Sequence, residues 1–114
     1  MNIFDIYLSK INEIILDNKK ALKLSTLDNL KNINLEVPPE HHNYDLSSNV
    51  SLVLAKNNKL NPINLASEIK GLLLKRESHF EKIDIAGPGF INIKLSNDAL
   101  VFNINKILKN KDTY

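Results

Sequence analysis

The sequence of 114 residues predicts an α+β fold, a two-layer α/β sandwich whose small, mainly antiparallel sheet carries helices on one face. Apolar residues recur at helical spacing in four stretches, and they alternate with polar residues in three others. A Gly-Pro-Gly turn joins the last two alternating stretches into a hairpin. Because the alternating stretches have one polar side, we expect one face of the sheet to be partly open.

Composition predicts one domain spanning residues 1–114, with enough apolar content (43%) to build a core. The absence of cysteine excludes disulfides and cysteine-based metal sites or nucleophiles. The start lacks the pattern of a signal peptide, and no stretch is long enough to span a membrane, so we expect a cytoplasmic protein. The net charge of +2 permits a basic patch but does not require one.

Residues 3–16 form the first predicted helix, with Asn2 as its cap. Its apolar stripe, which we assign to the core, consists of Ile3, Tyr7, Ile11, Ile14 and Ile15. The following lysines, Lys19, Lys20 and Lys23, are expected on a solvated surface rather than at a phosphate site. Ser25 and Thr26 are candidate caps for a short turn of helix that runs through Leu30.

Residues 33–37 alternate as a half-buried strand, which Pro38 and Pro39 end. The polar residues 40–49 are expected to form a surface loop. His41 and His42 suggest a metal site, but neighbours in an extended chain point apart and no third ligand has suitable spacing. We therefore expect no metal here.

Two helices follow this loop. Leu46, Val50, Val53 and Leu54 fit one face of a helix that ends at residues 57–58. Asn61 then caps a second helix, residues 62–76, with proline at its first position. Gly71 in its middle either weakens the helix slightly or lets another backbone approach.

The hairpin consists of residues 80–86 and 90–95, joined by Gly87, Pro88 and Gly89. Ser96 or Asn97 then caps a final helix. The apolar face of that helix comprises Leu100, Val101, Ile104, Ile107 and Leu108.

The second strand of the hairpin presents a mixed row of side chains on one face. Phe90, Asn92 and Lys94 alternate with the apolar Ile91, Ile93 and Leu95, which we assign to the core. A ring can stack on an unpaired base, an amide can hydrogen-bond to the base edge, and an ammonium can lie near a phosphate. The alternative is that Phe90 belongs to the core and that Asn92 and Lys94 are merely solvated.

Two motifs resemble the N-terminal additional domain of arginyl-tRNA synthetases. The first is the stretch Ala86-Gly87-Pro88-Gly89-Phe90-Ile91-Asn92, which is similar to the family signature AGPGFIN. The second is Val37-Pro38 followed by Asp45-Leu46-Ser47-Ser48-Asn49-Val50 and an amphipathic helix. The resemblance covers essentially all of the chain. It departs from the family at Tyr44, where the family usually has glycine.

The resemblance implies a tRNA-recognition module that contacts the D-loop of arginine tRNA. In the family, an aromatic and an amide residue two positions apart lie against an exposed D-loop base, and these positions match Phe90 and Asn92. We expect Lys94 to assist them. We assign Asp45, Ser48 and Asn49 to the support of the sheet, with Asn49 donating to carbonyls near the Gly-Pro turn.

The chain has no HIGH-like sequence, no glycine-rich phosphate loop and no credible acid/base pair, so we expect no enzymatic activity and no cofactor in this chain alone. The resemblance implies that it ends about where the linker to a class I catalytic domain begins, and that the longer ligase uses ATP and Mg²⁺. The implied partners are arginine tRNA and the remainder of the synthetase, with no membrane, and we expect a monomer. A protein-interaction or interdomain docking module without nucleic-acid contact is the alternative.

Overall fold

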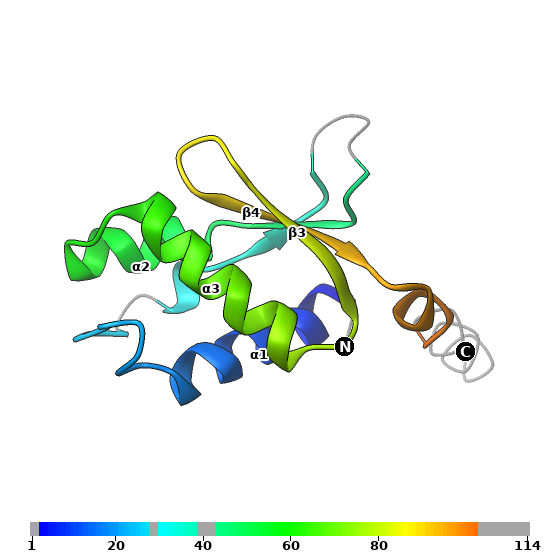
Figure 1. The fold of residues 1–114 in the computed structure, drawn as a ribbon, viewed down its shortest axis with the longest axis horizontal. Coiled ribbons are helices and arrows are strands. Elements are labelled where there is room, and N and C mark those ends of the chain that lie inside the picture. The colour runs from blue at the N-terminus through cyan, green and yellow to red at the C-terminus, as the bar shows by residue number, and fades with distance from the viewer. Residues whose placement is uncertain (1–2, 28–29, 39–42, 103–114) are drawn as a thin grey trace.

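The computed structural model describes residues 3–27, 30–38 and 43–102 (Figure 1). In chain order the elements are α1 (Ile3–Asp17), the 3-10 turn η1 (Leu30–Asn32), β1 (Leu35–Glu36), β2 (Leu46–Ser48), α2 (Val50–Asn58), α3 (Pro62–Arg76), β3 (Phe80–Ala86) and β4 (Phe90–Leu95). Residues 97–102 are also helical. None of the helices in these ranges combines the length and the apolar character needed to cross a membrane.

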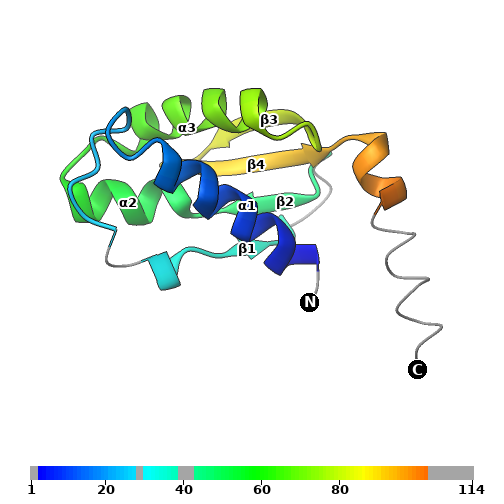
Figure 2. The ribbon, with the colours of Figure 1, turned by 90° about the horizontal axis from the view of Figure 1, so that it is seen from below.

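The four strands form one antiparallel sheet in the order β1-β2-β4-β3. Helices α1 and α3 lie on one side of this sheet (Figure 2), and α2 packs against α3 and β4. The arrangement confirms the predicted α+β sandwich with an antiparallel sheet and one helical layer.

The core fills the space between the sheet and the helical layer. Ile83 of β3 and Ile91 and Ile93 of β4 point into it, because side chains on a strand alternate between its two faces. From the helices it receives Tyr7, Ile11 and Ile15 of α1 together with Leu65, Ile69 and Leu73 of α3. The α1 residues belong to the stripe predicted from helical spacing, and the α3 residues recur at the same spacing.

The structure confirms most of the predicted elements. The side chain of Asn61 accepts a hydrogen bond of 3.0 Å from the backbone N–H of Asn64. Asn61 thus caps α3, which begins at Pro62. Ser96 Oγ likewise accepts from the N–H of Ala99 at 3.1 Å and caps the helical residues 97–102. Three residues, 87–89, separate β3 from β4, as the hairpin prediction requires.

The prediction of a loop over residues 40–49 is wrong at its end. Leu46, predicted on a helix face, lies in β2, which pairs with both β1 and β4. The sequence of this strand is Leu46-Ser47-Ser48, and a single apolar residue gives too weak an alternation to identify a strand. β1 is likewise shorter than the predicted strand over residues 33–37. His41 and His42 lie outside the described residues.

Two other predicted segments are described only in part. The turn of helix predicted after Ser25 and Thr26 includes residues 28–29, which lie outside the described ranges; the backbone N–H groups of Ser25 and Thr26 donate to the side chain of Asn58, at 2.7 and 2.9 Å. Leu100 and Val101, on the predicted apolar face of the final helix, are exposed. The other predicted members of that face, Ile104, Ile107 and Leu108, lie outside the described residues.

Candidate nucleic-acid interface

The Gly-Pro-Gly turn fixes where β4 begins. Gly87 and Gly89 have φ angles of +56° and +142°, which L side chains rarely adopt. The N–H of Gly89 donates to the carbonyl of Ala86 at 3.2 Å and closes the turn. A Cβ added at Gly89 would lie 3.2 Å from the Cβ of Pro62, so the turn is packed tightly against the start of α3. The position of the first residue of β4 is therefore well defined.

Phe90 and Asn92 lie side by side on the face of the sheet that points away from α1 and α3. Their inward neighbours, Ile91 and Ile93, are fully buried, whereas 40% of Phe90 is exposed. Asn92 stands opposite Asp84 of β3 and Ser47 of β2 in the strand register. Its side-chain amide forms no hydrogen bond with any residue of the described ranges, so both its donor and its acceptor are available to a ligand.

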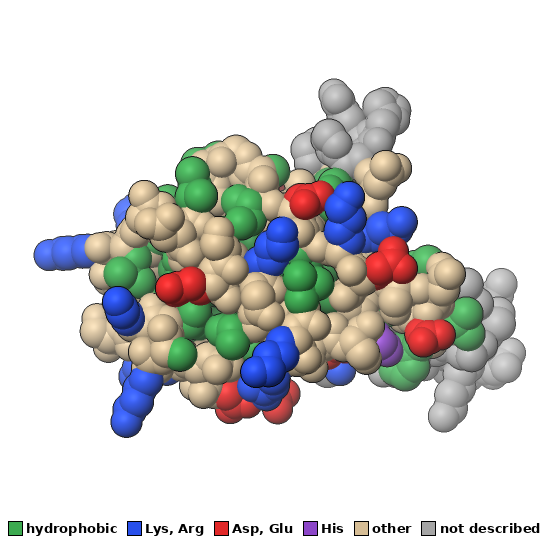
Figure 3. Space-filling view, in the orientation of Figure 1, with side chains coloured by type: hydrophobic (Ala, Val, Ile, Leu, Met, Phe, Trp, Pro, Cys, Tyr) green, Lys and Arg blue, Asp and Glu red, His purple; other side chains and the backbone are tan. Residues whose placement is uncertain are grey.

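Lys94 continues the same row, two positions after Asn92. Its ammonium lies 3.5 Å from a carboxylate oxygen of Glu81, and both side chains are exposed. Its register partner on β3, Lys82, similarly lies 3.6 Å from Asp84. Figure 3 shows basic and acidic side chains next to each other in the upper right of the molecule, rather than a large field of one sign. Exposed ion pairs are weak, and a phosphate can replace the carboxylate partner.

Asp45 and Ser48, which we assign to the support of the sheet, both form hydrogen bonds with backbone groups. Asp45 donates its N–H to the carbonyl of Ile93 and accepts from the N–H of Leu95 through its carboxylate, both at 2.8 Å. The hydroxyl of Ser48 is buried and accepts from the N–H of Val50 at 3.1 Å.

The predicted hydrogen-bond partner of Asn49 is wrong. Its amide donates to the carbonyl of Asn32 at 3.1 Å and accepts from the N–H of Asn34 at 2.8 Å. It therefore links the start of α2 to the segment before β1, away from the Gly-Pro turn. The prediction failed because strand order, which sets the neighbours of Asn49, depends on β2, and the sequence pattern does not reveal β2.

Sequence reasoning missed one residue on this face, Tyr44. Its hydroxyl donates to the carboxylate of Asp84, and the ammonium of Lys82 lies 5.9 Å from the centre of its ring. Tyr44 is not among the described residues with positive φ, so the backbone accommodates a side chain here without strain. The sequence did mark Tyr44 as unusual, because the resembling family usually has glycine at this position. Residue spacing could not predict that its side chain extends to Asp84 on β3.

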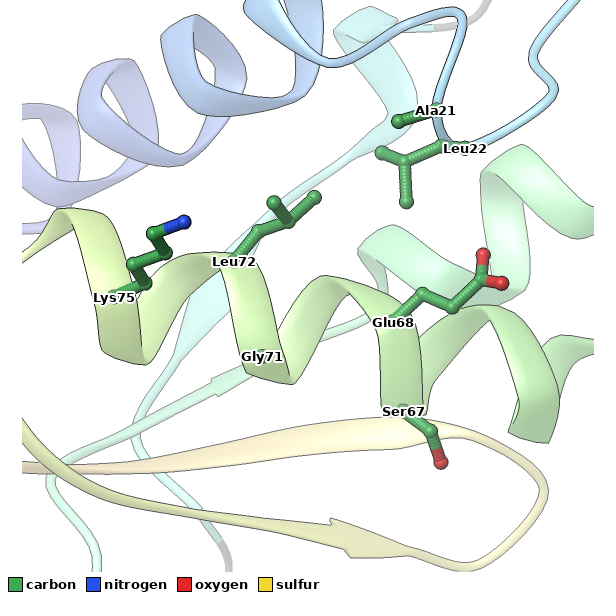
Figure 4. A pocket seen from close by; sticks show the side chains of 7 residues that line it. All are labelled: Ala21, Leu22, Ser67, Glu68, Gly71, Leu72 and Lys75. Carbon is green, nitrogen blue, oxygen red and sulfur yellow. The ribbon is translucent and has the colours of Figure 1, made fainter.

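A separate hollow of about 390 Å³ lies on the helical side, between α3 and the turn after α1 (Figure 4). It is lined by Ala21, Leu22, Ser67, Glu68, Gly71, Leu72 and Lys75. Leu72 points toward Leu22, whereas Ser67 points away from the turn (Figure 4). One carboxylate and one ammonium on the same helix do not make an acid/base pair aimed at a common point. In the ranges that the structure describes, no three potential metal-ligating side chains come together.

Comparison with known proteins identifies the family. Residues 9–95 match the family model described as the arginyl tRNA synthetase N terminal domain. An arginine–tRNA ligase of Pelagibacter ubique is 42% identical over 82% of this chain and 16% of its own length. One of Staphylococcus carnosus is 39% identical over 98% of this chain and 20% of its own length. One of Thermotoga maritima is 44% identical over 70% of this chain and 14% of its own length. The chain thus spans a fifth or less of these curated relatives. The matched residues include the sheet with Phe90 and Asn92, and the chain belongs to the family of arginyl-tRNA synthetase N-terminal domains.

Proposed function

We propose that this chain is a one-domain tRNA-binding module that contacts the D-loop of arginine tRNA through the outer face of its sheet. Phe90 stacks on an unpaired loop base, Asn92 hydrogen-bonds to the edge of that base, and Lys94 lies near a phosphate. The observation that supports this role is the pair of Phe90 and Asn92, a partly exposed ring beside an amide that has no partner in the described ranges.

The module acts in a longer arginine–tRNA ligase of class I, in which it supports ATP- and Mg²⁺-dependent aminoacylation by orienting the tRNA. The names of the relatives and the small fraction of their length that the chain covers support this context. By itself the chain carries out no aminoacylation and needs no cofactor. It acts as a monomer in the cytoplasm, with arginine tRNA and the rest of the synthetase as its partners.

An NMR titration of the isotope-labelled chain with a transcript of arginine tRNA tests the proposal, because NMR detects weak binding residue by residue. We expect the side-chain amide signals of Asn92 to shift, and Phe90→Ala to weaken binding about 5- to 150-fold, the loss of one stacked base. Leu16→Ala is the matched control, since it removes an exposed apolar side chain from α1. Unchanged binding by Phe90→Ala would contradict the proposed role of the ring.

A docking module without nucleic-acid contact is the second candidate, and a different surface favours it. Leu100, Val101 and Phe102 are all exposed on the helical residues 97–102. This surface suits contact with the remainder of the synthetase rather than with RNA. Under this alternative, Val101→Asp in the full-length enzyme lowers aminoacylation, while Phe90→Ala leaves the KM for tRNA unchanged. The two results together distinguish docking from tRNA contact.

A further inference from the structure

The backbone of Tyr44 lies on the β2 side of β4, but its side chain extends across the open face of the sheet to β3 on the opposite side. The next residue, Asp45, is held beside β4 by two hydrogen bonds of 2.8 Å, to Ile93 and Leu95. From there the Tyr44 hydroxyl reaches Asp84 of β3. Because β4 lies between β2 and β3, the phenol ring must cross the outer surface of β4 to make this contact.

The contacts of Tyr44 place it directly next to the proposed base site. Asp84, which accepts from its hydroxyl, is the register partner of Asn92. Lys82, whose ammonium lies 5.9 Å from the ring centre, is the register partner of Lys94. Tyr44 therefore adjoins the amide on one side and a pair of lysines on the other.

We infer that Tyr44 is a second stacking residue, which holds the nucleotide next to the one on Phe90, while Lys82 and Lys94 contact the phosphate between them. This inference rests on the proposed function and extends it from one base to two neighbouring ones. Other four-stranded sheets bind two or three successive bases on aromatic side chains of one face. A second ring on this face allows the same arrangement.

Two physical features suit Tyr44 to this role. Its hydroxyl is held by a charge-assisted hydrogen bond to Asp84, so the ring loses little freedom when a base stacks on it. Lys82 and Lys94 face each other with like charge, which is unfavourable until an anion lies between them. Their present carboxylate partners, Asp84 and Glu81, form exposed pairs that a phosphate can replace.

Two variants of Tyr44 separate stacking from other roles in the same titration with arginine tRNA. Tyr44→Phe keeps the ring and is expected to bind within about three-fold of the native chain, whereas Tyr44→Leu keeps the bulk without the π-face and should bind about 5- to 150-fold more weakly. If Tyr44→Phe binds as weakly as Tyr44→Leu, the hydroxyl matters rather than the ring, and the inference is wrong. Amide spectra of each variant check that the fold is intact.

Transcripts with an abasic nucleotide at each D-loop position in turn provide the decisive readout. We expect one D-loop position at which removing the base weakens binding to the native chain but not to Phe90→Ala. At a neighbouring position, removing the base should weaken binding to the native chain but not to Tyr44→Leu. If Phe90→Ala shows its coupled position and Tyr44→Leu shows none, the second site fails while the proposed function stands. If neither variant couples to any position, both fail.

Discussion

Gly71 and Gly89 show how differently the same residue type acts at two places in this chain. Gly89 is required by its backbone, with a φ of +142°, and by its close approach to Pro62. Gly71 lies in the middle of α3, and a Cβ added there would meet no heavy atom within 4 Å. The sequence left two explanations for Gly71, a weakened helix or a close backbone neighbour, and the structure of the described residues favours the first.

Gly71→Ala is accordingly expected to raise the free energy of unfolding by about 0.5–1 kcal/mol, because alanine loses less backbone entropy in a helix. Thermal unfolding of the chain measures this as an increase in Tm of several degrees. The paired control, Gly89→Ala, should lower the Tm, since alanine is strained at positive φ and would press on Pro62. A lower Tm for Gly71→Ala would contradict this expectation, because the added methyl group would then have to meet a neighbour.

Asn58, at the end of α2, has the most extensive side-chain hydrogen bonding among the residues described. Its carbonyl oxygen accepts from Ser25 N, Ser25 Oγ and Thr26 N, at 2.7, 3.1 and 2.9 Å. Its amide nitrogen donates to the carbonyls of Thr26 and Leu54, at 3.1 and 2.9 Å. It joins the segment after α1 to the end of α2, a contact that sequence spacing gives no means of predicting.

Asn58→Ala is expected to lower the free energy of unfolding by about 2–3 kcal/mol, because several hydrogen bonds of about 1 kcal/mol each are lost together. Denaturant unfolding measures the change, and faster hydrogen exchange at Ser25 and Thr26 locates it. Lys56→Ala, an exposed position in the last turn of the same helix, should change stability by less than about 0.5 kcal/mol. Equal effects of the two variants would mean that the segment is held by other contacts.

At the level of whole elements, the sequence predicts a helix or strand well where its hydrophobic pattern is long, and poorly where that pattern is short. α1, α3 and the hairpin follow from many repeats of one period, so their existence and their buried faces were predictable. β2 has three residues and β1 two, and both exist because of their partners in the sheet. The outward positions of Phe90 and Asn92 follow from the period of β4 alone, whereas the reach of Tyr44 to Asp84 depends on strand order.

In the molecule as a whole, the two faces of the sheet differ in character. The helical layer covers the apolar face of the sheet and provides about half of the buried apolar side chains. The outer face carries polar and aromatic groups, among them Phe90, Asn92 and Lys94. The four strands contain only two lysines, Lys82 and Lys94, and each is paired with a carboxylate. Such a surface provides local contacts rather than a strong attractive field, consistent with a net charge of +2.

Binding of arginine tRNA through this face should therefore depend only moderately on salt. Each phosphate contact to single-stranded nucleic acid contributes about −0.7 to the slope of log K against log salt, so two lysines give a slope of about −1.4, or a roughly seven-fold loss of affinity between 50 and 200 mM salt.

Lys94→Gln should reduce the slope by about 0.7, because one contact is lost, whereas Lys56→Gln on α2 should leave it unchanged. Titrations at several salt concentrations measure both slopes. A slope steeper than about −4 would require more phosphate contacts than the strands can supply, and would move the main tRNA contact away from the sheet.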